Sequence, residues 1–386
     1  MKNKRKVCFV IHNRANFARV KTVLECISSD SNAEIQIVLA SSSLIKHYGR
    51  LDDIIETYGL EKVESVYNVI MGDNPVSMAK TTGLALIELA QVFSRIKPDC
   101  VITVADRHET LATAIAASYM NIPLIHIQGG EISGSIDESV RHACTKLAHL
   151  HFPSTEKAKK VVMQLGENPN TVFNFGCPAI DIVHRSPNIK ASRILGKYSG
   201  VGPEFNVDDG FLLVVQHPVT THYLTSSLEN EMLLKAIVEA RKPAIWLWPN
   251  VDSGSEGIAK SLRRFRESNR DIPIRFYTNL SPEDYASLLR QARCIVGNSS
   301  SGIRESSFLG LPAINIGDRQ SGRESGENVI SVDFKFDSIF EAIDFQWNHG
   351  FYAGSSLYGL GDAGPKIASK IMSFEPVLEK KFFWNQ

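Results

Sequence analysis

The chain has 386 residues, and its 42 Lys and Arg residues balance its 42 Asp and Glu residues, so the formal net charge is zero. This balance argues against a protein that binds nucleic acid through bulk positive charge, and it gives no basis for an acidic tail or a polybasic membrane arm. Hydrophobic residues make up 43% and charged residues 22%, a composition typical of globular rather than disordered proteins. The length predicts about two domains.

The apolar runs of the sequence are short. None reaches the roughly 20 apolar residues that a membrane span requires. The basic N-terminus runs directly into residues 7–11, a run too short for the core of a signal peptide and not followed by a cleavage site of small residues. The six cysteines are scattered without a CxxC pair, which argues against a zinc site or a disulfide framework. We therefore expect a cytoplasmic protein without a metal site.

Apolar runs alternate with amphipathic stretches in the first half of the chain, a pattern typical of parallel strands joined by helical crossovers. Strands are predicted at 7–11, 34–40, 100–105, 123–128, 149–152 and 172–176. Helices are predicted near 17–27, 76–95, 108–120, 138–148 and 156–165.

The second half repeats this alternation. Strands are predicted at 211–216, 244–248, 274–277, 294–296 and 313–316, and helices near 226–240, 256–269, 282–292, 302–309 and 338–348. The intervening residues 187–209 lack clear periodicity, so we place the domain junction there; a long surface loop inside one domain is the alternative. The sequence therefore predicts two doubly wound α/β domains, 1–186 and 187–364, with a ligand in the cleft at the carboxyl ends of their strands.

Polar side chains follow the predicted strands of the first half. Arg14 lies at the turn after the first strand, where an arginine can bind a phosphate or a base edge, although a surface arginine would pair with any nearby carboxylate. Asp106 and Arg107 follow the strand at 100–105, and a helix cap with solvated neighbours is the alternative there.

The loop after the strand at 123–128 is rich in ionisable groups. Two glycines suggest close backbone approach, and three carboxylates follow within eight residues, Glu131 and Asp137 among them. Arg141 lies one helical turn beyond Asp137. Because Asp106 and this loop follow consecutive strands, we favour an acid/base pair of carboxylates over a capped helix with a solvated acidic turn.

The second half offers a phosphate site. His217 follows a predicted strand, where an imidazole can contact a phosphate, transfer a proton or be purely structural. Ser299, Ser300 and Ser301 form a small polar turn before a helix, and their hydroxyls together with free helix N–H groups can cradle a phosphate. Glu305 lies one turn into that helix, where a carboxylate can accept two hydrogen bonds from a ribose diol. An ordinary serine cap is the alternative.

A Gly-rich loop at 317–328 carries Arg319 and Arg323, which can reach a diphosphate or belong to a solvated connection. The second half thus offers a phosphate cradle and a ribose acid, and the first half offers a carboxylate cluster. Together these features suit a sugar nucleotide held across an interdomain cleft.

As an ordered set, these motifs resemble those of the hydrolysing UDP-N-acetylglucosamine 2-epimerases. The matching segments are Asp106-Arg107, 126–131, 136–142, 216–221, 297–305 and 319–328, within a resemblance that spans 7–328. The resemblance implies the GT-B architecture of two Rossmann-like domains, with a C-terminal helix at 365–374, in a tail of 365–386, that returns to the first domain. It also implies a homodimer or homotetramer, no cofactor, and a UDP-sugar as the small-molecule partner.

The reaction that the resemblance implies has two steps and serves sialic acid-type biosynthesis. A base removes the proton at C2 of the sugar while UDP leaves C1, and water then adds to 2-acetamidoglucal, so that N-acetylmannosamine with C2 inverted is released. The acid/base candidates are Asp106, Asp137 and Glu131. The implied substrate contacts are Arg14 at the uridine, Glu305 at the ribose, Arg107, His217, Ser299, Ser300 and Ser301 at the diphosphate, Arg319 or Arg323 near the phosphates, and Arg141 beside the carboxylates.

Two positions depart from the pattern of the family. Gln128 is still a candidate catalytic residue, but relatives often carry Glu at this position. If that Glu is a catalytic acid in them, Asp106, Asp137 or Glu131 must take its role in this chain. Asn16 and Phe17 stand where many relatives carry Asp-Tyr, in a loop that contacts the nucleotide. A related branch acts on UDP-N,N′-diacetylbacillosamine in legionaminic acid synthesis. That substrate, a non-hydrolysing epimerase, a GT-B glycosyltransferase and a non-enzymatic UDP-sugar binding module are the alternatives.

Overall fold

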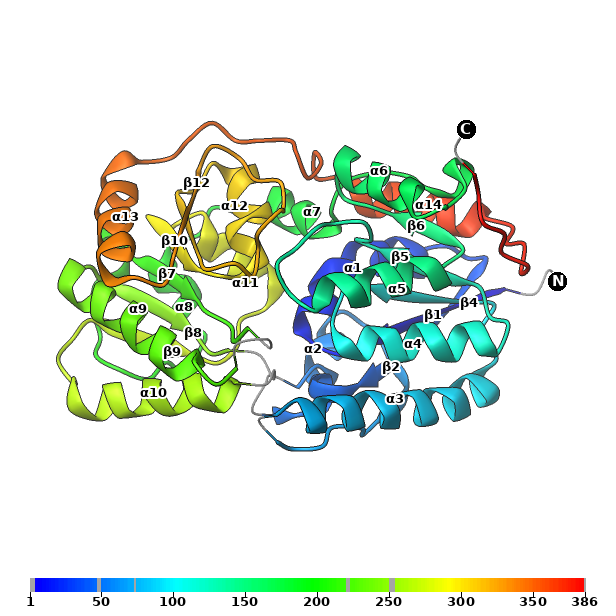
Figure 1. The fold of residues 1–386 in the computed structure, drawn as a ribbon, viewed down its shortest axis with the longest axis horizontal. Coiled ribbons are helices and arrows are strands. Elements are labelled where there is room, and N and C mark those ends of the chain that lie inside the picture. Colours follow the sequence, from blue (N-terminus) through cyan, green and yellow to red (C-terminus); the bar gives the residue numbers. More distant parts are fainter. Residues whose placement is uncertain (1–3, 47–49, 73, 220–222, 250–253, 385–386) are drawn as a thin grey trace.

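The structure is a computed structural model, and it describes residues 4–46, 50–72, 74–219, 223–249 and 254–384. Two α/β lobes lie side by side, with the first half of the chain in one and most of the second half in the other (Figure 1). Each lobe holds one six-stranded sheet, in the orders β3-β2-β1-β4-β5-β6 and β12-β11-β10-β7-β8-β9. All of these strand pairs are parallel, which confirms the predicted α/β class with two Rossmann-like domains.

The first strand of the chain, β1, lies at the centre of the first sheet, between β2 and β4. Its strands are β1 Arg5–Ile11, β2 Ala33–Ala40, β3 Lys62–Val66, β4 Cys100–Val104, β5 Leu124–Ile127 and β6 Leu150–Phe152. The accompanying helices are α1 Arg14–Ser28, α2 Asp52–Thr57, α3 Pro75–Ile96, α4 His108–Tyr119, α5 Asp137–Leu147 and α6 Glu156–Gln164. The strand order reverses between β1 and β4, which is where ligands bind in such sheets.

The second sheet has the same order when it is counted from its own first strand, β7. Its strands are β7 Leu212–Val215, β8 Ala244–Leu247, β9 Ile274–Tyr277, β10 Cys294–Gly297, β11 Ala313–Ile316 and β12 Val329–Val332. Its helices are α9 Ser226–Ala240, α10 Ser255–Ser268, α11 Pro282–Leu289, α12 Arg304–Leu309 and α13 Phe336–His349. Here the order reverses between β7 and β10.

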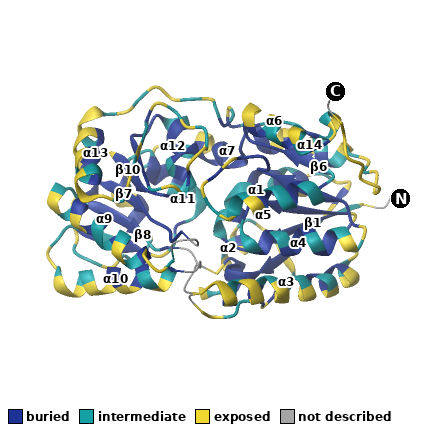
Figure 2. Cartoon of the chain, in the orientation of Figure 1, coloured by how far each residue is buried: buried dark blue, intermediate teal, exposed yellow. Residues whose placement is uncertain are grey.

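The central strands form because apolar side chains can be buried on both faces of the sheet. In β1, Val7, Phe9 and Ile11 pack in one cluster with α1, and the alternate residues Cys8 and Val10 pack in another with α3 and α4. Buried residues follow the strands of both lobes, whereas the outer faces of α3, α10 and α13 are exposed (Figure 2). No described helix has the length and apolar character needed to cross a bilayer.

Several elements differ from the sequence predictions. The predicted strand at 172–176 is wrong: only Val172 pairs, through an isolated bridge to His151. The edge strands β3 and β12 were not predicted, because they are short and only partly buried. The short helices α7 (Pro178–Arg185) and α8 (Ala191–Leu195) were also missed.

The end of the chain crosses from the second lobe back to the first (Figure 1). Helix α14 (Ala363–Ser373) packs against α1, with Ile367 and Ile371 in the core of the first lobe. Its first N–H groups are capped by the carboxylate of Asp181 in α7, at 2.9 Å from the nitrogen of Ala363 and 2.6 Å from that of Gly364. The domain boundaries at 186/187 and 364/365 stay predictions.

The tail after α14 is tied to the first lobe by a buried ion-pair cluster. Glu167 is 1% exposed and lies 2.6 Å from the Nζ atoms of both Lys146 and Lys380, and 3.1 Å from Nε2 of His151. Lys380 also donates to the carbonyl of Thr145 at the end of α5. Burial raises the pKa of Glu167, but its contacts with His151 and the two lysines outweigh burial and hold that pKa at about 2.

Glu167→Gln is expected to lower the free energy of unfolding by about 2 kcal/mol, because it leaves Lys146 and Lys380, whose side chains are 40% and 23% exposed, without their buried counter-charge. The folded pKa of Glu167 lies below its ordinary value of 4.5, so this carboxylate stabilises the fold above about pH 4.5, and the contribution is lost as the pH falls toward 2. Urea denaturation of both proteins between pH 4 and 8 would measure this. Equal stabilities at pH 7 would show that the cluster contributes nothing.

Candidate active site

The loops that follow the central strands of the two sheets meet at the boundary between the lobes. Arg14, after β1, donates from Nη1 to the carbonyl of Thr278, after β9, at 3.0 Å. In the opposite direction, Arg323 of the loop after β11 donates to Asp106, after β4, at 3.1 Å. Arg14 and Asp106 follow β1 and β4, the two strands between which the order of the first sheet reverses, so this point of the first sheet faces the second lobe.

Backbone strain marks this edge of the first sheet. Ala105 and Gln128 directly follow β4 and β5, and both adopt left-handed conformations with φ of 63° and 66°. A residue with a Cβ atom pays roughly 1–2 kcal/mol there, a cost that is common at functional sites. The strain turns the chain sharply, so that Asp106 and the 128–131 segment leave the sheet toward the second lobe.

A cavity of about 180 Å³ lies between the lobes on the β1 side. It is lined by Arg14, Arg19, His217, Trp248, Tyr285, Ser299, Ser300, Ser301 and Glu305, among others. Six of the predicted substrate-binding residues are thus brought together: Arg14, His217, the three serines and Glu305. The lining includes two arginines, the serine hydroxyls, a carboxylate and aromatic rings, which are the groups that hold a nucleoside diphosphate.

The serine turn is built at the end of β10. Gly297 has φ of 132°, and a Cβ atom there would meet the carbonyl of Val215 at 2.3 Å, so only glycine allows the close approach to β7. The hydroxyl of Ser299 then accepts from the nitrogen of Ser301, and the hydroxyls of Ser301 and Tyr285 lie 2.5 Å apart. The turn therefore offers oriented hydroxyls, and its role as a phosphate cradle stays a prediction.

Glu305 and His217 have electrostatic settings that suit a polar ligand. Oε2 of Glu305 is buried without a hydrogen-bond partner in the described structure, and burial raises the pKa of this carboxyl group. Burial, followed by the charge of Arg319, lowers the pKa of His217 well below its ordinary value, so the imidazole is neutral. The backbone of His217 is fixed by two 2.8 Å hydrogen bonds with the side chain of Asn298.

Arg19 is a residue of this cavity that the sequence analysis missed. Its Nη2 atom donates to the hydroxyl of Ser300 at 2.8 Å, across the boundary between the lobes. Burial lowers the pKa of its guanidinium. The only signal in the sequence is a second arginine five residues after Arg14, inside the helix predicted near 17–27.

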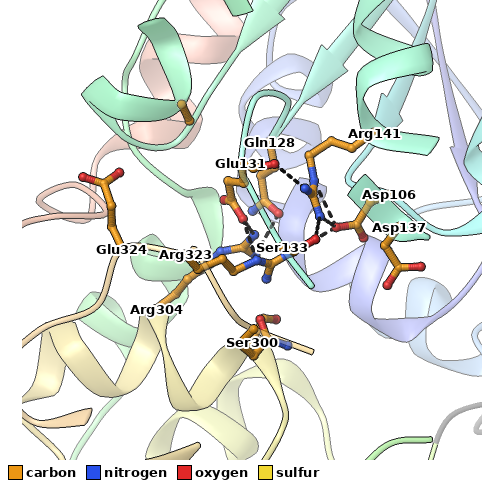
Figure 3. Close-up of polar contacts among 12 residues, drawn as sticks. Asp106, Gln128, Glu131, Ser133, Asp137, Arg141, Ser300, Arg304, Arg323 and Glu324 are labelled. Atoms are coloured by element: carbon orange, nitrogen blue, oxygen red, sulfur yellow. Dashed lines mark hydrogen bonds and ion pairs between the residues drawn. The ribbon is translucent and has the colours of Figure 1, made fainter. Parts of the chain in front are cut away.

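The carboxylates form a second group, beside that cavity (Figure 3). Asp106 accepts hydrogen bonds from Arg141 and from Arg323, with Nε of Arg141 and Nη2 of Arg323 both at 3.1 Å. Burial alone raises the pKa of Asp106, but the two arginines hold it well below its usual range. Arg141 also donates to the hydroxyl of Ser133 at 3.0 Å, so it turns toward Asp106 and the loop after β5.

Glu131 is likewise a buried carboxylate between arginines. Its Oε2 atom lies 2.5 Å from Nη2 of Arg304 and 3.2 Å from Nε of Arg323. Burial raises its pKa, but these arginines outweigh burial and hold it at about 2. Gln128 accepts from Nη1 of Arg304 at 3.0 Å and donates to Sγ of Cys177 at 2.9 Å, so it orders the site without an ionisable group of its own.

Asp137 is drawn next to Asp106 in Figure 3, with its carboxylate turned away from Arg141. It is the first residue of α5 and lies 3.9 Å from Nη2 of Arg319. With Arg107 and Arg319 it lines a small recess between the lobes. Arg107 forms a bidentate pair with Glu109, both contacts at 3.2 Å. The structure therefore places the predicted residues in three adjoining groups, rather than all in one pocket.

Comparison with known proteins identifies the family of this chain. A family model described as UDP-N-acetylglucosamine 2-epimerase matches residues 25–372. The chain belongs to this family. The match includes the carboxylates, the serine turn and Glu305, and it begins after Arg14 and Arg19.

Two relatives of this epimerase family match over most of their length. A protein of Campylobacter jejuni named GDP/UDP-N,N′-diacetylbacillosamine 2-epimerase (hydrolyzing) is 33% identical over 345 residues, which cover 89% of this chain and 88% of that protein. A protein of Legionella pneumophila named UDP-N,N′-diacetylbacillosamine 2-epimerase (hydrolyzing) is 30% identical over 358 residues, which cover 92% and 93%.

A solved structure of the same epimerase family shares the fold. The crystal structure of UDP-GlcNAc 2-epimerase from Neisseria meningitidis bound to UDP-GlcNAc superposes with a TM-score of 0.76 at 16% identity, covering 96% of this chain and 100% of that one. The GT-B architecture expected from the sequence is therefore confirmed. The roles of individual residues stay predictions, and Thr220 and Thr221 of the predicted 216–221 motif lie outside the described residues.

Proposed function

We propose that this protein is a hydrolysing UDP-sugar 2-epimerase, which converts a UDP-2-acetamido sugar and water into UDP and the free sugar inverted at C2. One observation carries the proposal: a cavity between the lobes, suited to a nucleoside diphosphate, adjoins a cluster of carboxylates from the first lobe. The family match and the two hydrolysing relatives support it. UDP-N-acetylglucosamine is the first candidate substrate, with N-acetylmannosamine as its product.

We assign the base for C2 to Asp137. Its side chain is 22% exposed, against 10% for Asp106 and 4% for Glu131, and its contact with Arg319, at 3.9 Å, is longer than the 3.1 Å and 3.2 Å contacts of those two carboxylates with Arg323, so a sugar can reach it more readily. Asp137 takes the C2 proton, the C2–H electrons form the C1–C2 double bond of the glucal, and the C1–O electrons leave with UDP. Asp106 and Glu131, held as carboxylates, are placed to handle the water that then adds to C1 while C2 is reprotonated from the opposite face.

Departure of UDP requires that negative charge on the diphosphate be stabilised. Arg19 and the hydroxyls of Ser299 and Ser300 line the cavity where we place the phosphates, and a neutral His217 can donate one further hydrogen bond. Such preorganised donors act most strongly on the charge that develops as the C1–O bond breaks. The same groups hold UDP after the reaction, which fits an enzyme that releases UDP as a product.

The decisive test is the product mixture from UDP-N-acetylglucosamine without any acceptor, followed by NMR. We expect equimolar UDP and free N-acetylmannosamine. Accumulation of UDP-N-acetylmannosamine would show a non-hydrolysing epimerase, and turnover only with an added acceptor would show a glycosyltransferase. UDP binding without turnover of either candidate substrate would leave a binding module, and it would overturn the proposal.

UDP-N,N′-diacetylbacillosamine is the second candidate substrate. It is favoured by the two relatives at 33% and 30% identity, both of which are named for this sugar. The two sugars differ only at C4 and C6, so the same elimination and hydration apply. Parallel kcat/KM measurements on both UDP-sugars would decide between them, and the preferred one is expected to exceed the other by at least tenfold.

Glu305→Gln is expected to weaken UDP binding about tenfold, since a hydrogen bond to a charged acceptor contributes roughly 1.5–3 kcal/mol. The variant should also lose the preference for UDP over 2′-deoxy-UDP, because we place this carboxylate at the ribose diol. Calorimetric titration with both nucleotides measures the two effects. If the wild-type protein binds both nucleotides equally, Glu305 does not hold the diol.

We further propose that the enzyme supplies a nonulosonic acid pathway in the cytoplasm, as a homodimer or homotetramer. The six cysteines are all free in the structure, which suits a reducing compartment. Sedimentation equilibrium would test the oligomeric state, and a monomer at micromolar concentration would overturn that part of the proposal.

A further inference from the structure

Arg304 joins the two halves of the site, and none of the roles considered above uses it. It is the first residue of α12, directly before Glu305 and three residues after Ser301, which ends the serine turn. Its side chain is 2% exposed and extends into the other lobe. There Nη1 donates to Oε1 of Gln128 at 3.0 Å and Nη2 donates to Oε2 of Glu131 at 2.5 Å (Figure 3).

The surroundings of Arg304 allow few other arrangements. Cζ of Arg304 lies 5.8 Å from the ring centroid of Tyr358, whose hydroxyl is held by the carbonyl of Glu324 at 2.6 Å. On the other side, Gln128 donates to Cys177, and this contact directs its Oε1 atom toward the guanidinium. The planar fork of Arg304 is therefore packed in one orientation, with its two arms on the two side chains of the first lobe.

We propose that Arg304 is a positioning residue that couples the nucleotide-binding turn of the second lobe to Glu131 of the first. In this role, it orients Glu131 and holds it as a carboxylate when the lobes are closed around UDP. The inference rests on the proposed function, in which Glu131 is one of the acid/base groups. Arg304 acts through Glu131 and lines neither the nucleotide cavity nor the recess at Asp137.

The free oxygen of Glu131 supports this role. Oε2 is occupied by Arg304, whereas Oε1 is buried without a hydrogen-bond partner among the described residues. A buried carboxylate oxygen left without a donor is costly unless a ligand supplies one. The contact with Arg304 therefore fixes one oxygen and presents the other to the site.

The neutral amide of Gln128 is also explained. The guanidinium of Arg304 contacts one amide and one carboxylate, so Glu131 is the only one of these two partners that carries a counter-charge. A second carboxylate at position 128 would compete for that charge and would repel Glu131, and the pKa of Glu131 would rise. The departure of Gln128 from the pattern of its relatives is thereby tied to the ionisation of Glu131.

The test uses Arg304→Gln, Arg304→Lys and the isosteric Gln128→Glu, followed by kcat/KM–pH profiles. Because loss of Arg304 leaves Glu131 more easily protonated, we expect the acid limb of Arg304→Gln to move up by at least one pH unit, with kcat about 100-fold lower at neutral pH. Gln128→Glu should move the limb in the same direction, and Arg304→Lys should restore part of both losses. Lower activity with an unmoved acid limb in Arg304→Gln and Gln128→Glu would reduce Arg304 to a structural contact.

UDP binding tests the coupling without turnover. Arg304→Gln and Glu131→Gln should each weaken UDP binding about threefold to tenfold by calorimetry, and the double variant should be no weaker than the worse single one. Additive losses would overturn the coupling. Arg264→Gln is the matched control, since Arg264 is 77% exposed on α10 and its loss should change neither readout. If no UDP-sugar is turned over but the losses of UDP affinity in the two single variants and the double variant are non-additive, the proposed function fails while the coupling stands.

Discussion

Asp137→Asn is expected to lower kcat about 1000-fold and to leave UDP affinity within about threefold of the wild type. General base catalysis contributes roughly 100- to 10,000-fold, and an amide cannot accept the C2 proton. Asp137 lies outside the residues that line the nucleotide cavity, so UDP should lose no contact. Its side chain is partly exposed, so the fold should tolerate an isosteric amide.

The measurement pairs single-turnover kinetics with calorimetric UDP titration. Exchange of the C2 proton with deuterated solvent isolates the step, because a variant that cannot remove this proton should show neither exchange nor glucal. Asp333→Asn is the matched control, since Asp333 is 77% exposed and pairs only with Lys335 among the ion pairs of the described chain. Deuterium exchange at the wild-type rate in Asp137→Asn would move the base to Asp106 or Glu131.

The buried strands were predictable because their chemistry is local. β4 and β10 are apolar runs that parallel packing buries on both faces, and their residues alone indicate this. β3 and β12 lie at the sheet edges, where a strand forms through backbone pairing with one neighbour. Their side chains are only partly buried and give no clear apolar pattern. The stretch at 172–176 shows the reverse error, because its phenylalanines pack against Phe152 without joining the sheet.

The candidate site was predictable to the extent that its groups follow strands. The ends of β4, β5, β7 and β10 gave the carboxylates, His217 and the serine turn. Arg19 and Arg304 were missed because their contacts join the two lobes. Arg19 and Ser300 are 281 residues apart in the sequence, and Arg304 and Glu131 are 173 apart. The same limit applies to Arg323, whose pairing with two carboxylates depends on closure of the lobes. Residue type indicates charge, but only the fold assigns the partner.

Asp106→Asn is expected to lose stability as well as turnover, which separates it from Asp137→Asn. Arg141 is fully buried against Asp106, and the amide would leave its guanidinium without a full counter-charge. Removing one partner of a buried pair costs about 3–5 kcal/mol, and a retained amide oxygen places the expected loss near the lower end, at about 3 kcal/mol. We also expect kcat to fall at least 100-fold, since Asp106 is one of the acid/base groups.

The stability loss in Asp106→Asn should depend on pH in a direction that the pKa of Asp106 determines. The arginines hold the folded pKa of Asp106 below its unfolded value of about 3.9, so its contribution to stability is fully present above that pH and is lost as the pH falls through the folded pKa. Urea denaturation should therefore show a constant gap between wild type and Asp106→Asn from about pH 5 to 8, and a narrowing gap below about pH 4. A gap that is independent of pH, or absent at pH 7, would show that Arg141 does not depend on this carboxylate. UDP affinity should be nearly unchanged, because Asp106 does not line the nucleotide cavity, and a large loss would mean that the arginine cluster sets the closure of the lobes.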